Sequence, residues 1–180
     1  PKIDLFEIIM TDFEDIDAFN SEFQNIANSQ NNSLSNYTFY TELPDDLIWF
    51  LGVDPSEAKN SKSDYMGISI VGKSPSLNKL FSIYNKGFRK TGLDLINLII
   101  ELHLKFNFKI IGVEKNLFGM LGEFILKEAK NKKVQLPLKM IHHSSNKKIR
   151  LESLGIDFEL GNLLLNPEEV MLLNEIKEFP

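Results

Sequence analysis

The sequence contains no cysteine among its 180 residues. Disulfide frameworks, thiolate zinc sites and cysteine nucleophiles are therefore excluded. It also has no apolar run of about 18 residues, the length that a membrane-spanning helix needs, so no such helix is expected. The first residues lack the basic-then-apolar pattern of a signal peptide. A soluble protein of a reducing compartment is the simplest class that fits these absences.

An excess of positive charge is also missing. The formal net charge is -5 and the pI is about 5.3, so the chain has no overall basic footprint for nucleic acid. A local basic strip is enough for phosphate contacts, and DNA binding therefore stays open. The shares of hydrophobic residues (43%) and charged residues (25%) are near the globular average, which excludes wholesale disorder. The length suits one domain of ordinary size.

Residues 1–45 differ in composition from the rest of the chain. The stretch 3–23 mixes acidic and aromatic residues and favours a short helix, whereas 25–36 is rich in Asn, Ser and Gln and indicates a loop. We therefore expect residues 1–45 to be a connector that packs on a core beginning near Leu47. Residues 46–180 then form the main domain.

Two apolar runs, each ending in an acid, are the clearest structural signals. Residues 47–54 and 109–114 are typical of buried strands. Further strands are predicted at 65–71 and 79–84, and their short connections favour an antiparallel meander with the first strand. The other predicted elements are helices at 91–106, 116–129, 146–154 and from Pro167 to 177, a strand at 135–141, and a β-hairpin across 158–165 with its turn at Gly161 and Asn162. The pattern predicts an α/β fold: a mixed sheet of three antiparallel strands followed by parallel βα units, flanked by helices, plus the hairpin.

The acids that end the two apolar runs are Asp54 and Glu114. In sheets of this kind ligands bind at the carboxyl ends of the parallel strands. If the two strands are neighbours, the carboxylates lie close enough to bridge divalent cations, and Mg²⁺ and Mn²⁺ favour such oxygen ligands. Two cations can activate water and stabilise the leaving oxygen of a phosphodiester. The alternative is that each acid ends its strand and faces solvent.

An ordered set of short segments spans nearly the whole chain: Ala18 to Asn25, Gly52 to Ser56, Ser63 to Ile68, Gly112 to Asn116 with Gly119, Asn146 to Arg150 with Leu154, Phe158 to Asn162, and Leu173 to Pro180. In this order the segments resemble the nuclease domain of the large terminase subunit of tailed bacteriophages and prophages.

The resemblance implies an RNase H-like fold and a two-metal DNA endonuclease that cuts concatemeric viral DNA during packaging. Asp54 and Glu114 match the family's acids on the first and fourth strands, as metal ligands and catalytic residues. A third carboxylate is expected beyond Pro180, because the family's last acidic motif follows a Phe-Pro pair. The cofactors implied are two ions of Mg²⁺ or Mn²⁺. Ala18 to Asn25 resembles the connector that leads from the family's ATPase domain into its nuclease, so residues 1–45 are interpreted as that connector. A Walker A phosphate loop is missing, so the ATPase domain itself is absent from this sequence.

The implied partners are double-stranded DNA, the portal protein, the small terminase subunit and the ATPase domain of the full-length chain, with no membrane. The implied location is the cytoplasm of a bacterial host.

Further candidate residues each have an ordinary structural explanation beside the functional one. Asp64 is an auxiliary catalytic candidate, or a turn residue that bonds its own backbone. His143 is a candidate metal ligand or proton carrier, or a surface residue at a strand end. Lys147, Lys148 and Arg150 are candidates for DNA binding at a helix start, or a solvated helix face.

Two other functions stay open from the sequence. One is another RNase H-like nuclease, such as a junction resolvase. The other is a non-catalytic docking module of the packaging motor, which the acidic overall charge suits slightly better than it suits a naked DNA binder.

Overall fold

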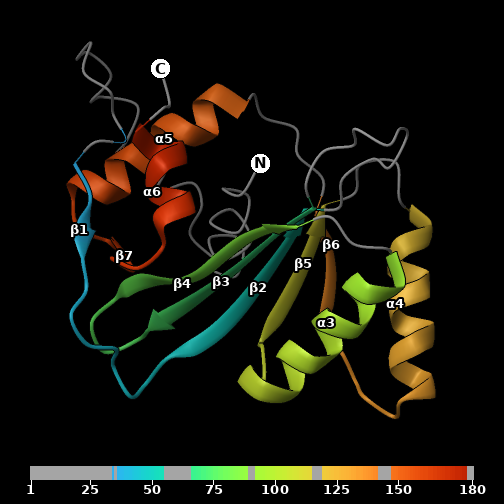
Figure 1. Ribbon diagram of the computed structural model, residues 1–180. Helices are drawn as coiled ribbons and strands as arrows, with labels where there is room; N and C mark the ends of the chain where they lie inside the picture. The colour runs from blue at the N-terminus through green and yellow to red at the C-terminus, as the bar shows by residue number, and fades with distance from the viewer. Residues whose placement is uncertain are drawn as a thin grey trace.

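The computed structural model describes residues 34, 36–54, 66–88, 92–114, 119–141 and 147–177. Strands and helices alternate after an initial meander (Figure 1). None of the described helices is long and apolar enough to cross a membrane. The elements are β1 (Thr38–Phe39), β2 (Ile48–Asp54), β3 (Met66–Ser74), β4 (Lys79–Phe88), α3 (Gly92–Phe106), β5 (Ile110–Glu114), α4 (Gly119–Asn131), β6 (Leu138–Ile141), α5 (Lys147–Glu159), β7 (Leu163–Leu165) and α6 (Val170–Lys177).

The described strands form one seven-stranded sheet in the order β1-β7-β4-β3-β2-β5-β6. β2, β3 and β4 are an antiparallel meander, and β5 and β6 run parallel to β2 on its other side. α3 and α4 make the two crossovers that parallel pairing requires. The predicted mixed sheet is confirmed, and so is the central position of the first apolar strand.

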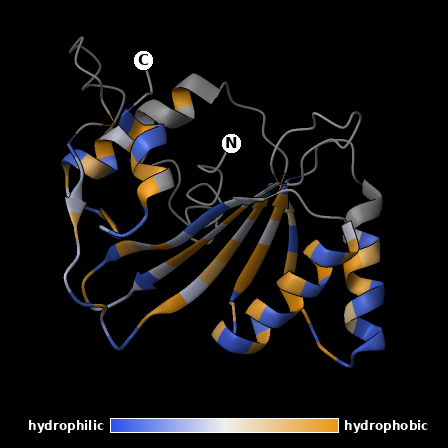
Figure 2. Ribbon diagram, in the orientation of Figure 1, coloured by the Kyte–Doolittle hydropathy of each residue, from blue (hydrophilic) through white to orange (hydrophobic). Residues whose placement is uncertain are grey.

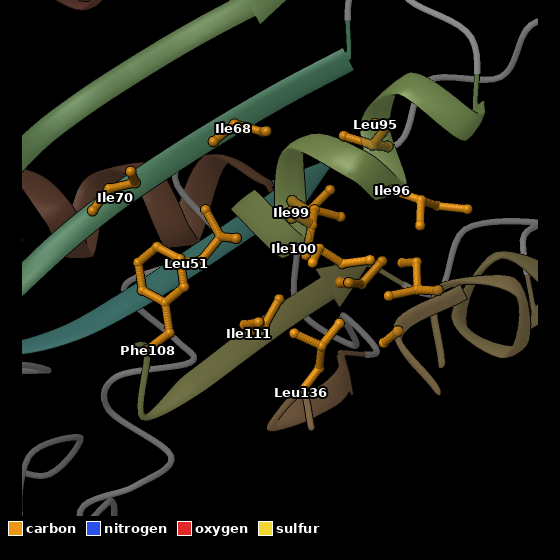
Figure 3. Packing of buried hydrophobic residues seen from close by; sticks show 14 residues of the cluster. Leu51, Ile68, Ile70, Leu95, Ile96, Ile99, Ile100, Phe108, Ile111 and Leu136 are labelled. Atoms are coloured by element: carbon orange, nitrogen blue, oxygen red, sulfur yellow. The ribbon is translucent and has the colours of Figure 1, made fainter. Parts of the chain in front are cut away.

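One face of the sheet is covered by α3 and α4 (Figure 1). α3 presents a stripe of buried side chains at helical spacing, from Leu95 to Ile100. These meet alternate residues of the central strands, among them Leu51 and Ile111, which are fully buried (Figure 3). Figure 2 shows the same amphipathic division, since both helices are hydrophilic on their outer sides. This first cluster is a continuous aliphatic core.

The other face packs against α5 and α6. Its cluster joins Phe50 of β2 to Leu154 and Phe158 of α5 and Ile176 of α6. Leu34 is buried in the same cluster, and β1 pairs with β7. The sheet and the core therefore include residues that precede position 46.

The predicted hairpin across 158–165 is wrong. Phe158 lies in the last turn of α5, and β7 pairs in parallel with both β4 and β1. Gly161 adopts a left-handed conformation (φ 66°), and the amide of Asn162 donates to the carbonyl of Asp157 (2.9 Å). That is how a glycine ends a helix. The Gly-Asn pair signals a helix terminus here and not a hairpin turn.

Other predicted boundaries of strands and helices differ from the observed ones by a few residues. The strand predicted at 135–141 begins only at Leu138, because Pro137 has no amide hydrogen for a ladder; its carbonyl accepts from the amide of Ile111 (2.9 Å). The last helix begins at Val170 rather than at Pro167. The helix predicted at 146–154 continues to Glu159. The helix predicted at 3–23 lies outside the described residues.

Candidate active site

Asp54 and Glu114 end two adjacent parallel strands. The register pairs Val53 with Val113, so the acids occupy the next position on each strand. Neighbouring strands are about 5 Å apart, so the two carboxylates project from adjacent backbones. Both residues are partly exposed. The condition set by the sequence, that the two strands be neighbours, is met.

The alternation of side chains places both acids on the face that carries α5 and α6. Leu51 and Val53 of β2 belong to the α3 cluster, so Gly52 and Asp54 point the other way. The same alternation along β5 turns Gly112 and Glu114 away from α3. We call a set of residues paired across neighbouring strands a row. Two rows next to each other have their side chains on the face that carries α5 and α6, and the first of them holds the acids. In strand order the rows are Gly87, Gly67, Asp54, Glu114 and Ile141, then Asn85, Ser69, Gly52, Gly112 and Lys139.

Glycines make these rows unusually bare. Gly52 and Gly112 pair with each other directly behind the acids, and Gly67 pairs with Asp54. A strand glycine weakens a sheet, and it often marks a place where a ligand or another backbone approaches closely. Here three of the positions behind and beside the carboxylates carry no side chain.

A buried polar network continues the second row. Ser69 donates to the side-chain oxygen of Asn85, whose amide nitrogen donates to Ser82 Oγ (2.7 Å). Ser82 and Asn85 share this face although they are three residues apart. A bulge in the β3–β4 pairing at Ile83 allows this, because one extra residue reverses the alternation. The amide group of Asn85 is thereby held in one orientation next to the site.

The same part of β4 anchors the segment that leads into α6. The backbone amide of Asn85 donates to Glu169 Oε2 (2.8 Å), and Asn166 Nδ2 donates to the carbonyl of Ile83 (3.2 Å). β7 pairs with β4 only up to Ser82, so these side chains bind backbone groups that the ladder leaves open. Burial, and then the charges of Glu169 and Glu168, raise the pKa of Tyr40 nearby.

The two carboxylates are candidate ligands for a metal ion. They are hard oxygen donors on adjacent strands with bare neighbours, which suits Mg²⁺ or Mn²⁺ better than softer metals. Among the described residues no three His, Asp or Glu side chains come together as a ligand set. The residues therefore fit a divalent cation that takes its other ligands from water, from substrate or from residues not described.

The remaining predicted residues are placed only in part. Asp64 and His143 lie outside the described residues. Lys147, Lys148 and Arg150 fall in the first turn of α5, which confirms the helix start, but only their backbone is described. His103, near the end of α3, packs beside Phe108 with a ring separation of 6.2 Å, and burial lowers its pKa.

Sequence reasoning missed the rest of the site face. Ser69 and Asn85 sit in strands whose alternation was visible, but the bulge at Ile83 was not. Lys139 alternates with Ile141 along β6, and that spacing was enough to place it on the acids' face once the strand order was known.

The seven-stranded mixed sheet flanked by helices has the RNase H-like fold that was expected from the sequence. No protein-family model matches the sequence, and no curated protein matches it either. Solved structures do match. The chain is similar to the human cytomegalovirus terminase nuclease domain, with a TM-score of 0.60, 13% identity, and coverage of 83% of this chain and 85% of that one.

Two proteins of thermophilic bacteriophages show the same likeness. The large terminase nuclease of phage G20c, solved with bound zinc, has a TM-score of 0.55 and 14% identity over 83% of this chain and 89% of that one. The large terminase of a second thermophilic bacteriophage has a TM-score of 0.57 and 10% identity, with 79% of this chain matched. That match spans only 35% of the second phage's terminase. The chain therefore has the fold of terminase nuclease domains.

Proposed function

We propose that this chain is a metal-dependent DNA endonuclease that cuts concatemeric viral DNA during genome packaging. The observation that supports it most is the placement of Asp54 and Glu114 on adjacent parallel strands. The likeness to terminase nuclease domains supports viral DNA as the class of substrate.

Asp54 and Glu114 are proposed as the residues that hold divalent cations, Mg²⁺ or Mn²⁺, in a site for two ions. Bound there, the ions supply the charge that activates water and stabilises the leaving oxygen of a phosphodiester. The proposed role of the two side chains is to bind and orient the ions, and the glycines of the two rows add no side chains beside them. Two neighbours support a divalent metal: the cytomegalovirus domain was soaked with manganese, and the G20c nuclease binds zinc. The family resemblance implies a third carboxylate beyond Pro180. Asp64 and His143 are auxiliary candidates from the sequence pattern.

DNA is proposed to reach the acids across the face that carries α5. Lys147, Lys148 and Arg150 lie in the first turn of that helix, where backbone amides also attract phosphate. Cuts would be placed by partners rather than by base recognition. The proposed partners are an ATPase domain in the full-length chain, the portal protein and the small terminase subunit, in the cytoplasm of a bacterial host.

Plasmid cleavage tests the proposal. The chain, and a version extended past Pro180 in its natural sequence, would be incubated with supercoiled plasmid and Mn²⁺. We expect the extended version to nick the plasmid, and Asp54→Ala to abolish nicking. Glu123→Ala is the matched control, because Glu123 is an exposed acid on α4, which covers the other face. If neither version cuts at any metal concentration, the nuclease proposal fails and a docking module replaces it.

A further inference from the structure

A lysine shares the site face with the two acids. Lys139 of β6 pairs with Gly112 of β5, and two residues further on Ile141 pairs with Glu114. Leu138 and Met140 pack against the α3 cluster, so Lys139 and Ile141 point to the opposite side. Lys139 therefore lies on the face of Asp54 and Glu114, one row behind them and one strand away from Glu114.

The two positions next to Lys139 in its row carry no side chains. These positions are Gly112 and Gly52. Diagonal neighbours in a sheet are about 7–8 Å apart, which long side chains can reach. Gly112 places no side chain between Lys139 and β2, and the side chain of Lys139 is long enough to bring its ammonium group toward Glu114. The side chain is exposed.

Lys139 adds a positive charge to a part of the site whose other charged residues are the two acids. Among the described residues of the two rows, the one that holds the acids and the one behind it, Lys139 is the single cation. An ammonium group beside carboxylates that hold cations is well placed for a nonbridging phosphate oxygen, and fixed positive charge stabilises charge that develops during reaction. A point charge of this kind binds phosphate without reading sequence.

We infer that Lys139 is a catalytic residue whose ammonium group binds the scissile phosphodiester held at Asp54 and Glu114. This inference rests on the proposed nuclease function and adds to it a phosphate contact from the edge strand. It differs from a purely protective role, in which an edge-strand lysine only prevents other strands from pairing.

Binding of DNA in the absence of cleavage tests the inference directly. Lys139→Met keeps the length of the stem and removes the charge, and Lys139→Arg keeps the charge. Lys130→Met is the control, because Lys130 is an exposed lysine near the end of α4, on the helix that covers the opposite face. Affinity for a short fluorescent duplex would be measured in EDTA at several salt concentrations. We expect Lys139→Met to lower the affinity several-fold and to reduce the salt slope by about one phosphate contact, roughly 0.9.

Single-turnover cleavage in Mn²⁺ is the second measurement. We expect Lys139→Met to slow the cut about 10- to 100-fold, with partial rescue in Lys139→Arg and no change in Lys130→Met. If Lys139→Met binds and cuts as the wild type does while Asp54→Ala is inactive, the inference fails and the nuclease proposal stands. The same holds if Lys139→Met only increases aggregation. If Asp54→Ala cuts as well as the wild type, the nuclease proposal itself fails.

Discussion

The two faces of β2 and β5 differ sharply although the same seven and five residues build both. Toward α3 the strands present Leu51, Val53, Ile111 and Val113, none more than 4% exposed. Toward α5 the residues between them are two glycines and two acids. Because side chains alternate along a strand, one short sequence serves two purposes.

The difference shows that the side chains that stabilise the fold and the candidate site residues lie on opposite faces of the same two strands. The α3 face buries fully packed aliphatic side chains, and the hydrophobic effect stabilises the fold by about 25 cal/mol for each Å² of apolar surface removed from water. The site face gives up that burial at the carboxyl ends of its strands. Its own hydrophobic cluster continues at the other positions, from Phe50 to Phe158. We therefore expect substitutions on the two faces to affect different measurements.

The largest effect on stability is expected from Ile111→Ala. Ile111 is fully buried in the α3 cluster, and truncating such a side chain leaves a cavity that costs about 2–5 kcal/mol. Denaturant unfolding followed by the fluorescence of Trp49 measures it. The variant that remains folded should keep the DNA affinity of the wild type. A loss of less than about 0.5 kcal/mol in the free energy of unfolding would contradict the difference in stability expected between the two faces.

The next effect concerns a buried acid at the far end of the site-side layer. Asp157 of α5 is 2% exposed, and only one of its oxygens has a partner, Asn162 Nδ2 at 3.2 Å. Burial raises its pKa from the ordinary value of 3.8 to about 6, while the bond from Asn162 opposes the shift. The folded state therefore favours the protonated acid. The contribution of the protonated Asp157 to the free energy of unfolding is fully present below the ordinary pKa of the acid. It is lost as the pH rises through about 6.

Asp157→Asn removes that pH-dependent loss. We expect the variant to exceed the wild type by about 1–3 kcal/mol at pH 7.5, since one pKa unit corresponds to about 1.4 kcal/mol. The advantage should disappear toward the ordinary pKa of the acid, 3.8. Unfolding free energies measured across this pH range check it, and parallel pH profiles for the two proteins would contradict the assignment.

A smaller effect is expected from Glu169→Ala. The variant leaves the backbone amide of Asn85 without its 2.8 Å acceptor, which costs about 1 kcal/mol. Glu169→Gln retains an acceptor and should lose less. The pKa of Tyr84, which burial and then the charge of Glu169 raise, should fall in both variants. Ultraviolet titration of the tyrosines measures it, and an unchanged titration in Glu169→Gln would be inconsistent with the contact.

The smallest effect on stability is expected where the effect on activity is greatest. Asp54→Asn combined with Glu114→Gln keeps size and removes charge at two partly exposed positions. We expect a change of less than about 1 kcal/mol in metal-free buffer, within the usual range outside the core. Cleavage should fall by about 100-fold or more. A variant that unfolds would mean that the acids have a structural role.

Much of the fold could be predicted from local pattern. The run from Leu47 to Asp54 and the stripe along α3 are long and regular, and both were placed correctly. The prediction failed at Gly161, because a glycine after a short polar helix and a glycine in a hairpin turn look alike in sequence. Parallel pairing of β7 depends on partners more than 70 residues away, which no local signal reports.

Part of the candidate site could also be predicted from local pattern, and part of it could not. Asp54 and Glu114 were recognisable because each ends an apolar run. Their adjacency depends on the strand order, which only the structure supplies. Lys139 looked like an ordinary exposed lysine until the register of β6 placed it beside Gly112. The bulge at Ile83, which turns Asn85 toward the site face, had no recognisable sequence signal.

Thermal unfolding in the presence of Mn²⁺ tests the central claim most directly, because it reports metal binding without relying on cleavage. A cation that binds the folded protein at Asp54 and Glu114 stabilises it by RT ln(1 + [Mn²⁺]/Kd). We predict that the Tm of the wild type rises with Mn²⁺ concentration and that the Tm of the Asp54→Asn, Glu114→Gln variant does not. Equal rises in both proteins would show that the ion binds elsewhere, and would contradict the assignment of these carboxylates as the metal site.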